Sequence, residues 1–544
     1  MKKFFKETWP VLVTIITFCF MLFLFEPMLM LMNNQNDFWF DMGILFEHSF
    51  ILFLIAFIIL FVVFLIAYKF NKKIFNILTI AFFVVFVCTY IQGNYLVGNL
   101  PLLDGEKVVY GGHLVDNLIT LGIWAIFIGL AIFLYKKLKV EELIKYTGYI
   151  SGVVFVMLFV SLLTVFINFS PSIYKIMTSA STYNNLNVYS TDKNYIILVL
   201  DACDSRLFNK TLTEDPEYKD LLKDFTYYPD TMSMHPYTLE SIPYILTNEV
   251  YQNQSRLDQY TTKAYKNSYL FKMMWDKDYD VNVYEKELFF YDNDALKISN
   301  VVDYNARTIN VRSIKFMKQE LKYVMFRYLP YFLKKYSNIE TMTWKRPELI
   351  ENAPDYYTDD NFWFVDYLKE HKLETKEQKQ FKFVHIDGAH VPFNMNKKLQ
   401  KLPDMTYKDE LEGTVVITDM YFDYLKESNV YDNSVIVVMA DHGYNFKEVS
   451  GRQNPILYIK GINEKHDKMQ ESSKPISFAD LKDAFTLLLE DKSSNELFQD
   501  IPNERTRRYL WYIYEEGNHM VEYETKDKAW ETDKMYKTGK TYDR

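Results

Sequence analysis

The chain has 544 residues and a formal net charge of −9, and 49% of its residues are hydrophobic. This length exceeds one typical domain, so we expect two or three units with separate cores. The acidic balance excludes nucleic acid as a partner, because binding its phosphates requires clustered Lys and Arg. Of the three cysteines only Cys203 lies outside the apolar segments, so no disulfide is available in the polar part of the chain.

Apolar residues concentrate in roughly the first 170 positions, and the rest has the mixed composition of a soluble fold. Five apolar stretches are long enough to cross about 30 Å of hydrocarbon as helices. The first is too long, and too closely followed by others, to be a cleaved signal. The predicted spans are Trp9–Met32, Ser49–Tyr68, Ile74–Gln92, Leu118–Tyr135 and Tyr149–Phe169. Residues 1–169 therefore form a predicted transmembrane domain.

Lysines predict the orientation of this domain. They precede the first span and fill the loops after the second and fourth spans, whereas the alternate loops are poorer in Lys and Arg. By the positive-inside rule the N-terminus is cytoplasmic, and five crossings place everything after Phe169 outside. We therefore expect a multi-pass protein of the plasma membrane. Glu26 lies near the outer end of the first span, before Pro27, where an interfacial carboxylate is favoured over a functional one inside the membrane.

The polar part of the chain begins with a Ser-, Thr- and Asn-rich stretch at residues 170–193, which is typical of a linker. Short apolar runs then alternate with amphipathic stretches, a pattern that suits a mainly parallel sheet between helices. We predict such an α/β domain over residues 194–500 and a small antiparallel appendage, opened by a hairpin, over residues 501–544. The predicted strands of the main sheet are Tyr195–Leu200, Phe381–Ile386, Ser434–Met439 and Pro455–Ile459.

Polar residues follow these strands at their carboxyl ends, where parallel sheets bind ligands. Asp201 and Asp204 follow the first strand, and Asp441 and His442 follow the third. Carboxylate oxygens combined with one imidazole suit Zn²⁺ or Mn²⁺. Aspartate is also common after a strand as a turn residue or helix cap, so each motif taken alone allows both interpretations.

Thr238 precedes a short apolar stretch, which predicts a helix with the Thr238 hydroxyl at its N-terminus. The backbone N–H groups and the helix dipole favour an anion at such a place. Bound to a metal, this hydroxyl would be a competent nucleophile toward phosphorus. The alternative is that Thr238 only caps the helix, with Glu240 and Ser241 in its first turn.

Four motifs occur in a fixed order along the chain. They are Asp201 after a strand, Thr238-x-x-Ser241-x-Pro243, His385-x-x-Gly388-x-His390-x-Pro392 and Asp441-His442-Gly443. This order resembles the membrane-bound phosphotransferases of the sulfatase and alkaline phosphatase superfamily, which include lipoteichoic acid synthase-like phosphoglycerol transferases and lipid A phosphoethanolamine transferases. Five spans before an exported catalytic domain are also similar, so the resemblance covers nearly the whole chain.

The resemblance implies a role for each matching residue. Thr238 is the expected nucleophile and, together with Asp201, Asp441 and His442, a ligand of one divalent ion, Mn²⁺ or Zn²⁺. His390 is expected to bind the phosphoryl oxygens or to protonate the leaving group. In the family a phospholipid donor passes its head group to the threonine, and an acceptor hydroxyl then takes that group. Further candidates for substrate contacts are Ser241, His235 and Arg452.

Several residues depart from the family pattern. The first ligand is usually Glu in the family and is Asp201 here, which leaves open whether Asp204 contributes. Cys203 lacks the Cys-x-Pro-x-Arg setting of a sulfatase nucleophile, and the cysteine pairs of the phosphoethanolamine transferases are absent, which favours the phosphoglycerol branch. His385 is expected to be structural. Where relatives have another His after the Asp-His-Gly motif, this chain has Arg452, Gln453 and Asn454.

The favoured function is therefore transfer of a phosphoglycerol-type or phosphoethanolamine head group from a membrane phospholipid to a cell-surface glycan or polymer. A phosphodiesterase or phosphatase on the same scaffold would use water as the acceptor, and the metal motif does not separate the two. A third interpretation is a non-catalytic protein that binds envelope polymers. The presence of Thr238, Asp441 and His442 together argues against this third interpretation.

Overall fold

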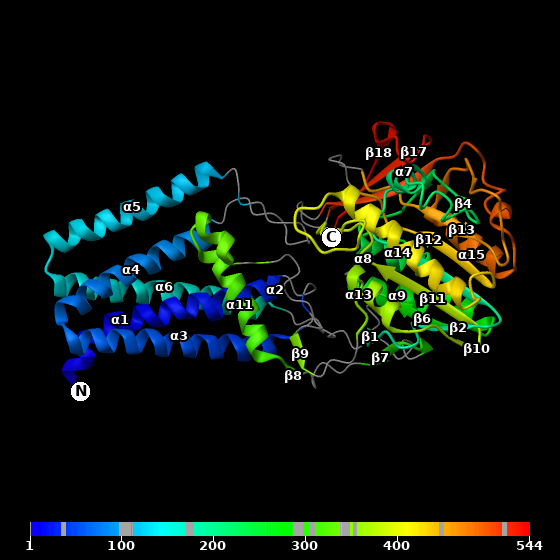
Figure 1. The fold of residues 1–544 in the computed structure, drawn as a ribbon. Helices are drawn as coiled ribbons and strands as arrows, with labels where there is room; N and C mark the ends of the chain where they lie inside the picture. The colour runs from blue at the N-terminus through cyan, green and yellow to red at the C-terminus, as the bar shows by residue number, and fades with distance from the viewer. Residues whose placement is uncertain are drawn as a thin grey trace. The chain divides into compact units, whose positions relative to one another are not determined.

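The computed structural model divides by internal contacts into two compact units, Met1–Ile176 with Ala306–Ala353, and Met177–Asn305 with Pro354–Arg544. We call them the membrane unit and the catalytic unit (Figure 1). The described residues are 2–33, 38, 40–96, 110, 113–169, 179–255, 257–286, 297–303, 310–337, 339, 349–351, 356–444, 451–513 and 519–543.

Among its described residues, the membrane unit contains five helices that are long and apolar enough to span a bilayer, as predicted. The first span runs from Phe4 to Asn33 and changes from α-helix to a π-helical turn and back. The helices are α1 (Lys2–Phe20), η1 (Met21–Phe25), α2 (Glu26–Asn33), α3 (Met42–Phe70), α4 (Lys72–Tyr95), α5 (Leu114–Lys137) and α6 (Val140–Asn168). Most of the predicted loop from Gly93 to Asn117 lies outside the described residues.

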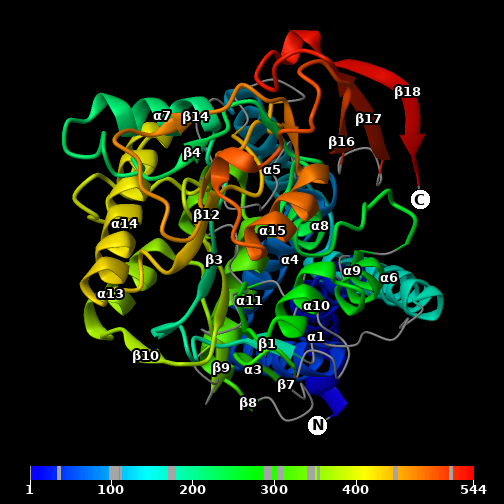
Figure 2. The same ribbon diagram turned by 90° about the vertical axis from the view of Figure 1, so that its right-hand side faces the viewer.

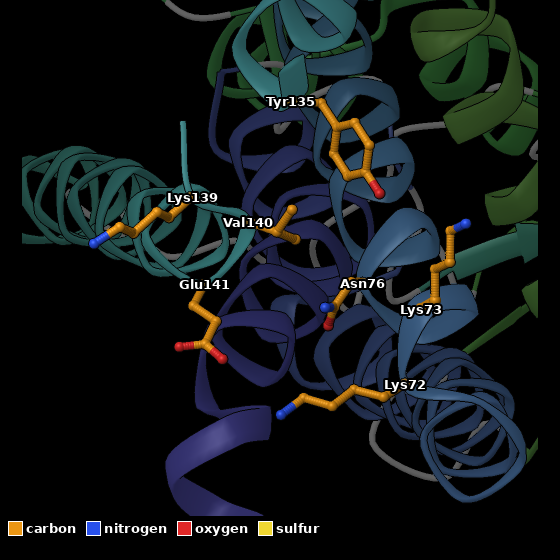
Figure 3. Close-up of a pocket in the computed structure, with 7 residues that line it drawn as sticks. All are labelled: Lys72, Lys73, Asn76, Tyr135, Lys139, Val140 and Glu141. Carbon is orange, nitrogen blue, oxygen red and sulfur yellow. The ribbon is translucent and has the colours of Figure 1, made fainter. Parts of the chain in front are cut away.

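Lysines gather at one end of these helices, where α3 turns into α4 and α5 into α6. Asn71 makes the first turn possible, because its side chain accepts hydrogen bonds from the N–H groups of Lys73 and Ile74 at the start of α4. Between the two turns lies a hollow of about 630 Å³ (Figure 3). Its lining residues are Lys72, Lys73, Asn76, Tyr135, Lys139, Val140 and Glu141.

A helix from the middle of the chain belongs to the membrane unit. Helix α11 (Ser313–Tyr328) and the following 3₁₀ helix η5 (Tyr331–Ser337) pack on the spans, and β8 (Asn310–Val311) pairs with β9 (Ile350–Glu351) beside them. Figure 1 shows α11 lying across α4 and the other spans rather than along them. The sequence had placed these residues in the α/β domain.

An ion pair between a half-buried arginine and a buried glutamate connects α11 to the first span. Arg327 Nε lies 2.7 Å from Glu26 Oε1, and the hydroxyls of Tyr323 and Tyr328 each donate to the same carboxylate at 3.3 Å. Glu26 is only 4% exposed. Glu26 is therefore not exposed, and Arg327 compensates its charge inside the unit. Further along α11, Glu320 accepts a hydrogen bond of 2.7 Å from Ser49 of α3.

The close approach of α11 to α4 requires a glycine. A Cβ added at Gly93 would lie 2.2 Å from the ring of Tyr328, whereas one added at Gly122 of α5 would meet nothing within 4 Å. We therefore expect Gly93→Ala to lower the stability of the full-length protein by about 1–3 kcal/mol through overpacking. Gly122→Ala is the matched control and should leave stability unchanged or raise it. Thermal unfolding in detergent measures both variants, and equal midpoints would contradict this packing.

The catalytic unit contains a seven-stranded sheet in the order β14-β4-β13-β12-β3-β11-β6. Its four-strand half, from β12 to β6, is parallel throughout, while β13 runs antiparallel to both neighbours. The bounds are β3 (Asn194–Leu200), β4 (Thr226–Tyr227), β6 (Asp280–Tyr284), β11 (Gln380–Ile386), β12 (Ser434–Met439), β13 (Leu457–Lys460) and β14 (Gln470–Glu471). The predicted mainly parallel α/β fold is confirmed.

Helices cover both faces of this sheet (Figure 2). Alternate residues of β3 enter opposite cores: Ile197 and Val199 pack with one helix group, and Ile196 and Leu198 with the other. The first group is α8 (Thr238–Thr247), α9 (Leu257–Lys266), α10 (Tyr269–Asp276) and α15 (Leu481–Leu489). The second is α7 (Ser205–Glu214), α13 (Asn361–Glu370) and α14 (Tyr407–Glu427). Burial on both faces explains why these strands are continuously apolar.

Short strands complete the unit. The predicted linker at 170–193 is described from residue 179 and contains two strands, β1 and β2, which pair with β7 and β10. The predicted C-terminal hairpin is present and gains a third antiparallel strand. The bounds are β1 (Ser179–Ser181), β2 (Val188–Ser190), β5 (Thr231–Met232), β7 (Val301–Asp303), β10 (Glu374–Lys376), β15 (Ile476–Ser477), β16 (Arg507–Ile513), β17 (His519–Thr525) and β18 (Tyr536–Tyr542).

Candidate metal and nucleophile site

Two neighbouring strands deliver the candidate metal ligands. Strands β3 and β12 are parallel and in register, so their carboxyl ends meet at one edge of the sheet. Asp201 follows β3 directly, and Asp441 and His442 follow β12 after a single alanine. All three side chains are buried, and one ligand atom from each lies within 4.8 Å of the others. The structure thus brings together the two carboxylates and the imidazole among the four predicted ligands.

The imidazole of His442 is oriented for coordination. Its Nδ1 lies 2.8 Å from the carbonyl oxygen of Gly443, a contact that requires the proton on Nδ1. The lone pair of Nε2 is then available, and this atom lies 3.6 Å from Asp201 Oδ1 and 3.5 Å from Asp441 Oδ2. A backbone partner for the second ring nitrogen is the usual arrangement for a metal-binding histidine.

The site fits a cation. Within the described part of the chain, Asp201 Oδ1 and Asp441 Oδ2 are buried and accept no hydrogen bond. Burial, and then the neighbouring Asp201 carboxylate, raises the pKa of Asp441. Burial would also raise the pKa of Asp201, but His390, His385 and His442 hold it well below its usual range. Burial lowers the pKa of His442, so the ring is neutral, as a ligand must be.

Thr238 is the first residue of α8, and its hydroxyl donates to Asp201 Oδ2 at 3.4 Å. The N-cap is Tyr237, whose side chain makes no capping bond. The alternative that Thr238 is merely the helix cap is therefore wrong. The threonine oxygen instead lies beside a candidate ligand and at a helix N-terminus, where free N–H groups attract anions.

Two small residues hold the ligand segments in place. Ser241 is fully buried and donates to the carbonyl oxygen of Asp441 at 2.6 Å, so its hydroxyl positions the ligand-bearing turn. Gly388 has φ of +54°, and a Cβ there would lie 2.6 Å from the nitrogen of Asp201. Only glycine allows this approach, which brings the turn after β11 against the end of β3.

A histidine and a glutamate lie behind Asp201. His385 Nε2 is 3.6 Å from Asp201 Oδ2, and its Nδ1 is 2.6 Å from Glu285 Oε2. Both side chains are buried. His385, expected to be structural, is thus held by Glu285 and faces the site through Asp201. Glu285 was missed, although it directly follows β6 and so occupies the same kind of position as Asp201.

His390 and Arg452 flank the cluster. His390 Nδ1 lies 2.7 Å from the carbonyl oxygen of Val391. Burial favours the neutral ring, but nearby carboxylates, above all Asp201, raise the pKa of His390. The guanidinium carbon of Arg452 lies 5.0 Å from the ring centroid of Tyr237, the residue before Thr238. A proton donor and a fixed cation are thus placed around the site.

The remaining predicted residues have other roles. Asp204 caps α7, accepting from the N–H groups of Arg206 and Leu207, and it lies outside the three-residue cluster. His235 is fully buried, packs against Tyr244, and has a pKa lowered to about 3 by burial and Arg508. Gln453 and Asn454 donate to backbone carbonyls, and burial raises the pKa of the Cys203 thiol, so it is not activated.

The family model described as Sulfatase matches residues 193–478, just over half of the chain. The chain belongs to the sulfatase family. Its matched region begins at β3 and ends after the candidate ligands, so it contains every residue of the cluster. Within the sulfatase and alkaline phosphatase superfamily, a divalent metal is the general rule, in agreement with the three-ligand site. Among curated proteins none matches the chain.

Solved structures with similar folds come from several members of this superfamily. An alkaline phosphatase superfamily protein from Vibrio parahaemolyticus is 14% identical, with 68% of this chain and 83% of that chain covered and a TM-score of 0.36. The lipoteichoic acid synthase LtaP from Listeria monocytogenes is 14% identical, with 65% and 87% covered and a TM-score of 0.34. BT1596, a 2-O GAG sulfatase, is 9% identical, with 64% and 85% covered and a TM-score of 0.36.

The Glu285–His385 pair is expected to orient Asp201 for metal binding. Replacing Glu285 by Gln weakens its hold on the His385 ring and should lower the affinity for Mn²⁺ or Zn²⁺ by about 10- to 100-fold, as for other residues behind a ligand. The exposed Glu427→Gln is the matched control. Calorimetric titration of the metal-free protein with Mn²⁺ or Zn²⁺ measures the affinity. Equal affinities in the two variants would show that the pair has no such role.

Proposed function

We propose that this protein transfers a phosphoglycerol-type or phosphoethanolamine head group from a membrane phospholipid to a surface glycan or polymer, through a phosphothreonine at Thr238. The observation that carries the proposal is the Thr238 hydroxyl, 3.4 Å from Asp201 at the N-terminus of α8 and beside the three-ligand cluster. A sulfatase nucleophile would require a convertible cysteine at this place. Cys203 is instead buried after β3, so phosphoryl transfer is favoured over sulfate ester hydrolysis.

The first half of the reaction uses Thr238 and His390. The Thr238 hydroxyl loses its proton to solvent, its oxygen bonds to phosphorus, and the bond from phosphorus to the diacylglycerol oxygen breaks. His390, whose pKa the surrounding carboxylates raise, gives its proton to that oxygen. A divalent ion held by Asp201, Asp441, His442 and Thr238 would stabilise charge on the phosphoryl oxygens and favour the ionised threonine.

The second half reverses these roles. An acceptor hydroxyl gives its proton to His390, its oxygen bonds to phosphorus, and the bond to Thr238 breaks, after which Thr238 regains a proton from solvent. Arg452, beside Tyr237 at the start of α8, supports the proposal as a fixed cation for the phosphoryl group. Five spans with lysines at one end support a multi-pass placement in the plasma membrane, with the catalytic unit outside and near its lipid donor.

The covalent step is tested with the full-length protein in nanodiscs. After incubation with phosphatidylglycerol or phosphatidylethanolamine and Mn²⁺ or Zn²⁺, mass spectrometry should find a glycerol phosphate or phosphoethanolamine adduct on Thr238. Thr238→Val, which keeps the shape and removes the hydroxyl, should abolish the adduct, and Thr247→Val in the same helix is the control. If Thr238 stayed unmodified with every phospholipid, the claim that a phospholipid is the head-group donor would be refuted. Label released as free head group, rather than passed to polymer, would identify a hydrolase.

His390 is tested through the leaving group. We expect His390→Gln to slow adduct formation from a phospholipid by about 10²- to 10⁴-fold, because the diacylglycerol oxygen needs a proton. With p-nitrophenyl glycerol phosphate, whose leaving group is stable as an anion, the loss should be much smaller. Rapid-quench measurement of the first turnover gives both rates. An equal loss with the two donors would assign His390 to binding instead of proton transfer.

A further inference from the structure

Helix α11 has two faces of different character. The face on the spans repeats every fourth residue, from Phe316 to Tyr328, and is buried. On the opposite face Lys315 and Lys318 are exposed and Lys322 is half-buried. Within the described part of the chain no carboxylate forms an ion pair with these three lysines. The outward charge of α11 is therefore only positive.

The acidic and cationic groups on the inner face do not change this charge. Glu320 is buried and accepts from Ser49, while Arg327 is paired with Glu26. The charged groups on the inner face of the helix therefore have partners within the membrane unit. The three outward lysines contribute uncompensated positive charge.

Large apolar side chains lie among these lysines. Ile314 is 80% exposed and Leu321 is 40% exposed on α11, and Phe332 (42%) and Tyr336 (61%) are exposed on η5, where Lys335 is exposed as well. A helix that faced water alone would have no reason to present these side chains. Lysines mixed with large apolar residues are instead the composition of a helix that lies in the membrane interface.

The position of α11 in the membrane unit agrees with this composition. Its partners are Glu26 near the end of the first span, Ser49 near the start of α3 and Gly93 near the end of α4. Because α3 ends and α4 begins at a lysine-rich turn, Ser49 and Gly93 lie toward the opposite end of the bundle. Figure 1 shows α2, which begins at Glu26, at that same end. Because α11 lies across the spans, its long axis is close to the plane in which head groups would lie (Figure 1).

We propose that the outward face of α11 and η5 binds anionic phospholipid head groups in the leaflet opposite the lysine-rich turns. Ile314, Leu321 and Phe332 enter the boundary between head groups and acyl chains, and the lysines reach the phosphates above it. Each lysine near an anionic surface favours binding by roughly fivefold. The further step, that these lipids include the donor, rests on the proposed function and gives the donor a negative charge.

The experiment uses the full-length protein in nanodiscs with photoactivatable phosphatidylglycerol or phosphatidylcholine. Crosslinks are mapped to peptides covering residues 313–337, which separates this surface from the lysine-lined hollow. The test variant replaces Lys315, Lys318 and Lys322 by Gln. A second variant replaces the same three by Arg and retains the charge. The matched control replaces Lys219, Lys272 and Lys468, all exposed in the catalytic unit, by Gln.

In the wild type, the Arg variant and the control, we expect phosphatidylglycerol to label these peptides at least about fivefold more than phosphatidylcholine, the effect of a single lysine. The Gln variant at α11, which retains Lys335, should lose most of this preference. Equal labelling in the wild type, or unchanged preference in the Gln variant, would overturn the proposal.

The adduct on Thr238 is measured in the same nanodiscs, so the two proposals fail separately. A Thr238 adduct without lipid preference at α11 would refute only the proposed lipid-binding surface. Preference at α11 without any adduct would refute only the transferase function.

Discussion

Two carboxylates buried side by side, each with one oxygen that accepts no hydrogen bond in the described structure, are the constraint on which the catalytic unit depends. Asp201 and Asp441 lie at the ends of adjacent parallel strands, and each leaves one oxygen unsatisfied in the described structure. Such a pair is unfavourable unless positive charge compensates it. The neighbouring features fit this requirement. His442, with its Nε2 free, and the hydroxyl beside Asp201 would help to hold a cation, and nearby histidines lower the pKa of the Asp201 carboxyl.

The strands and the ligands could be predicted from sequence because both are local signals. β12 has the predicted bounds, and β3 and β11 differ by one residue at the start. Continuous apolar runs identify strands buried on both faces, and a parallel sheet collects the residues that follow them. The antiparallel direction of β13 could not be predicted from the sequence, because a short apolar run has the same composition in either orientation.

Other parts of the site depend on which segments become neighbours. Glu285 follows a short strand that carries no motif, and its role appears only because β6 lies next to β11, which places it against His385. Glu26 was visible as a charged residue in an apolar span, but its partner Arg327 lies in a helix that composition assigns to the soluble part of the chain. Sequence periodicity does not specify such pairings, because they are set by tertiary packing.

The inclusion of α11 in the membrane unit changes how the catalytic unit is retained at the membrane. The chain passes between the two units three times, after Ile176, after Asn305 and after Ala353. A single proteolytic cut between the fifth span and β1 would therefore leave the catalytic unit attached, because its own chain still carries α11 on the spans through the Glu26–Arg327 pair. Shedding of an active fragment would need either two further cuts or the extraction of a buried charge, so this architecture favours permanent residence at the membrane.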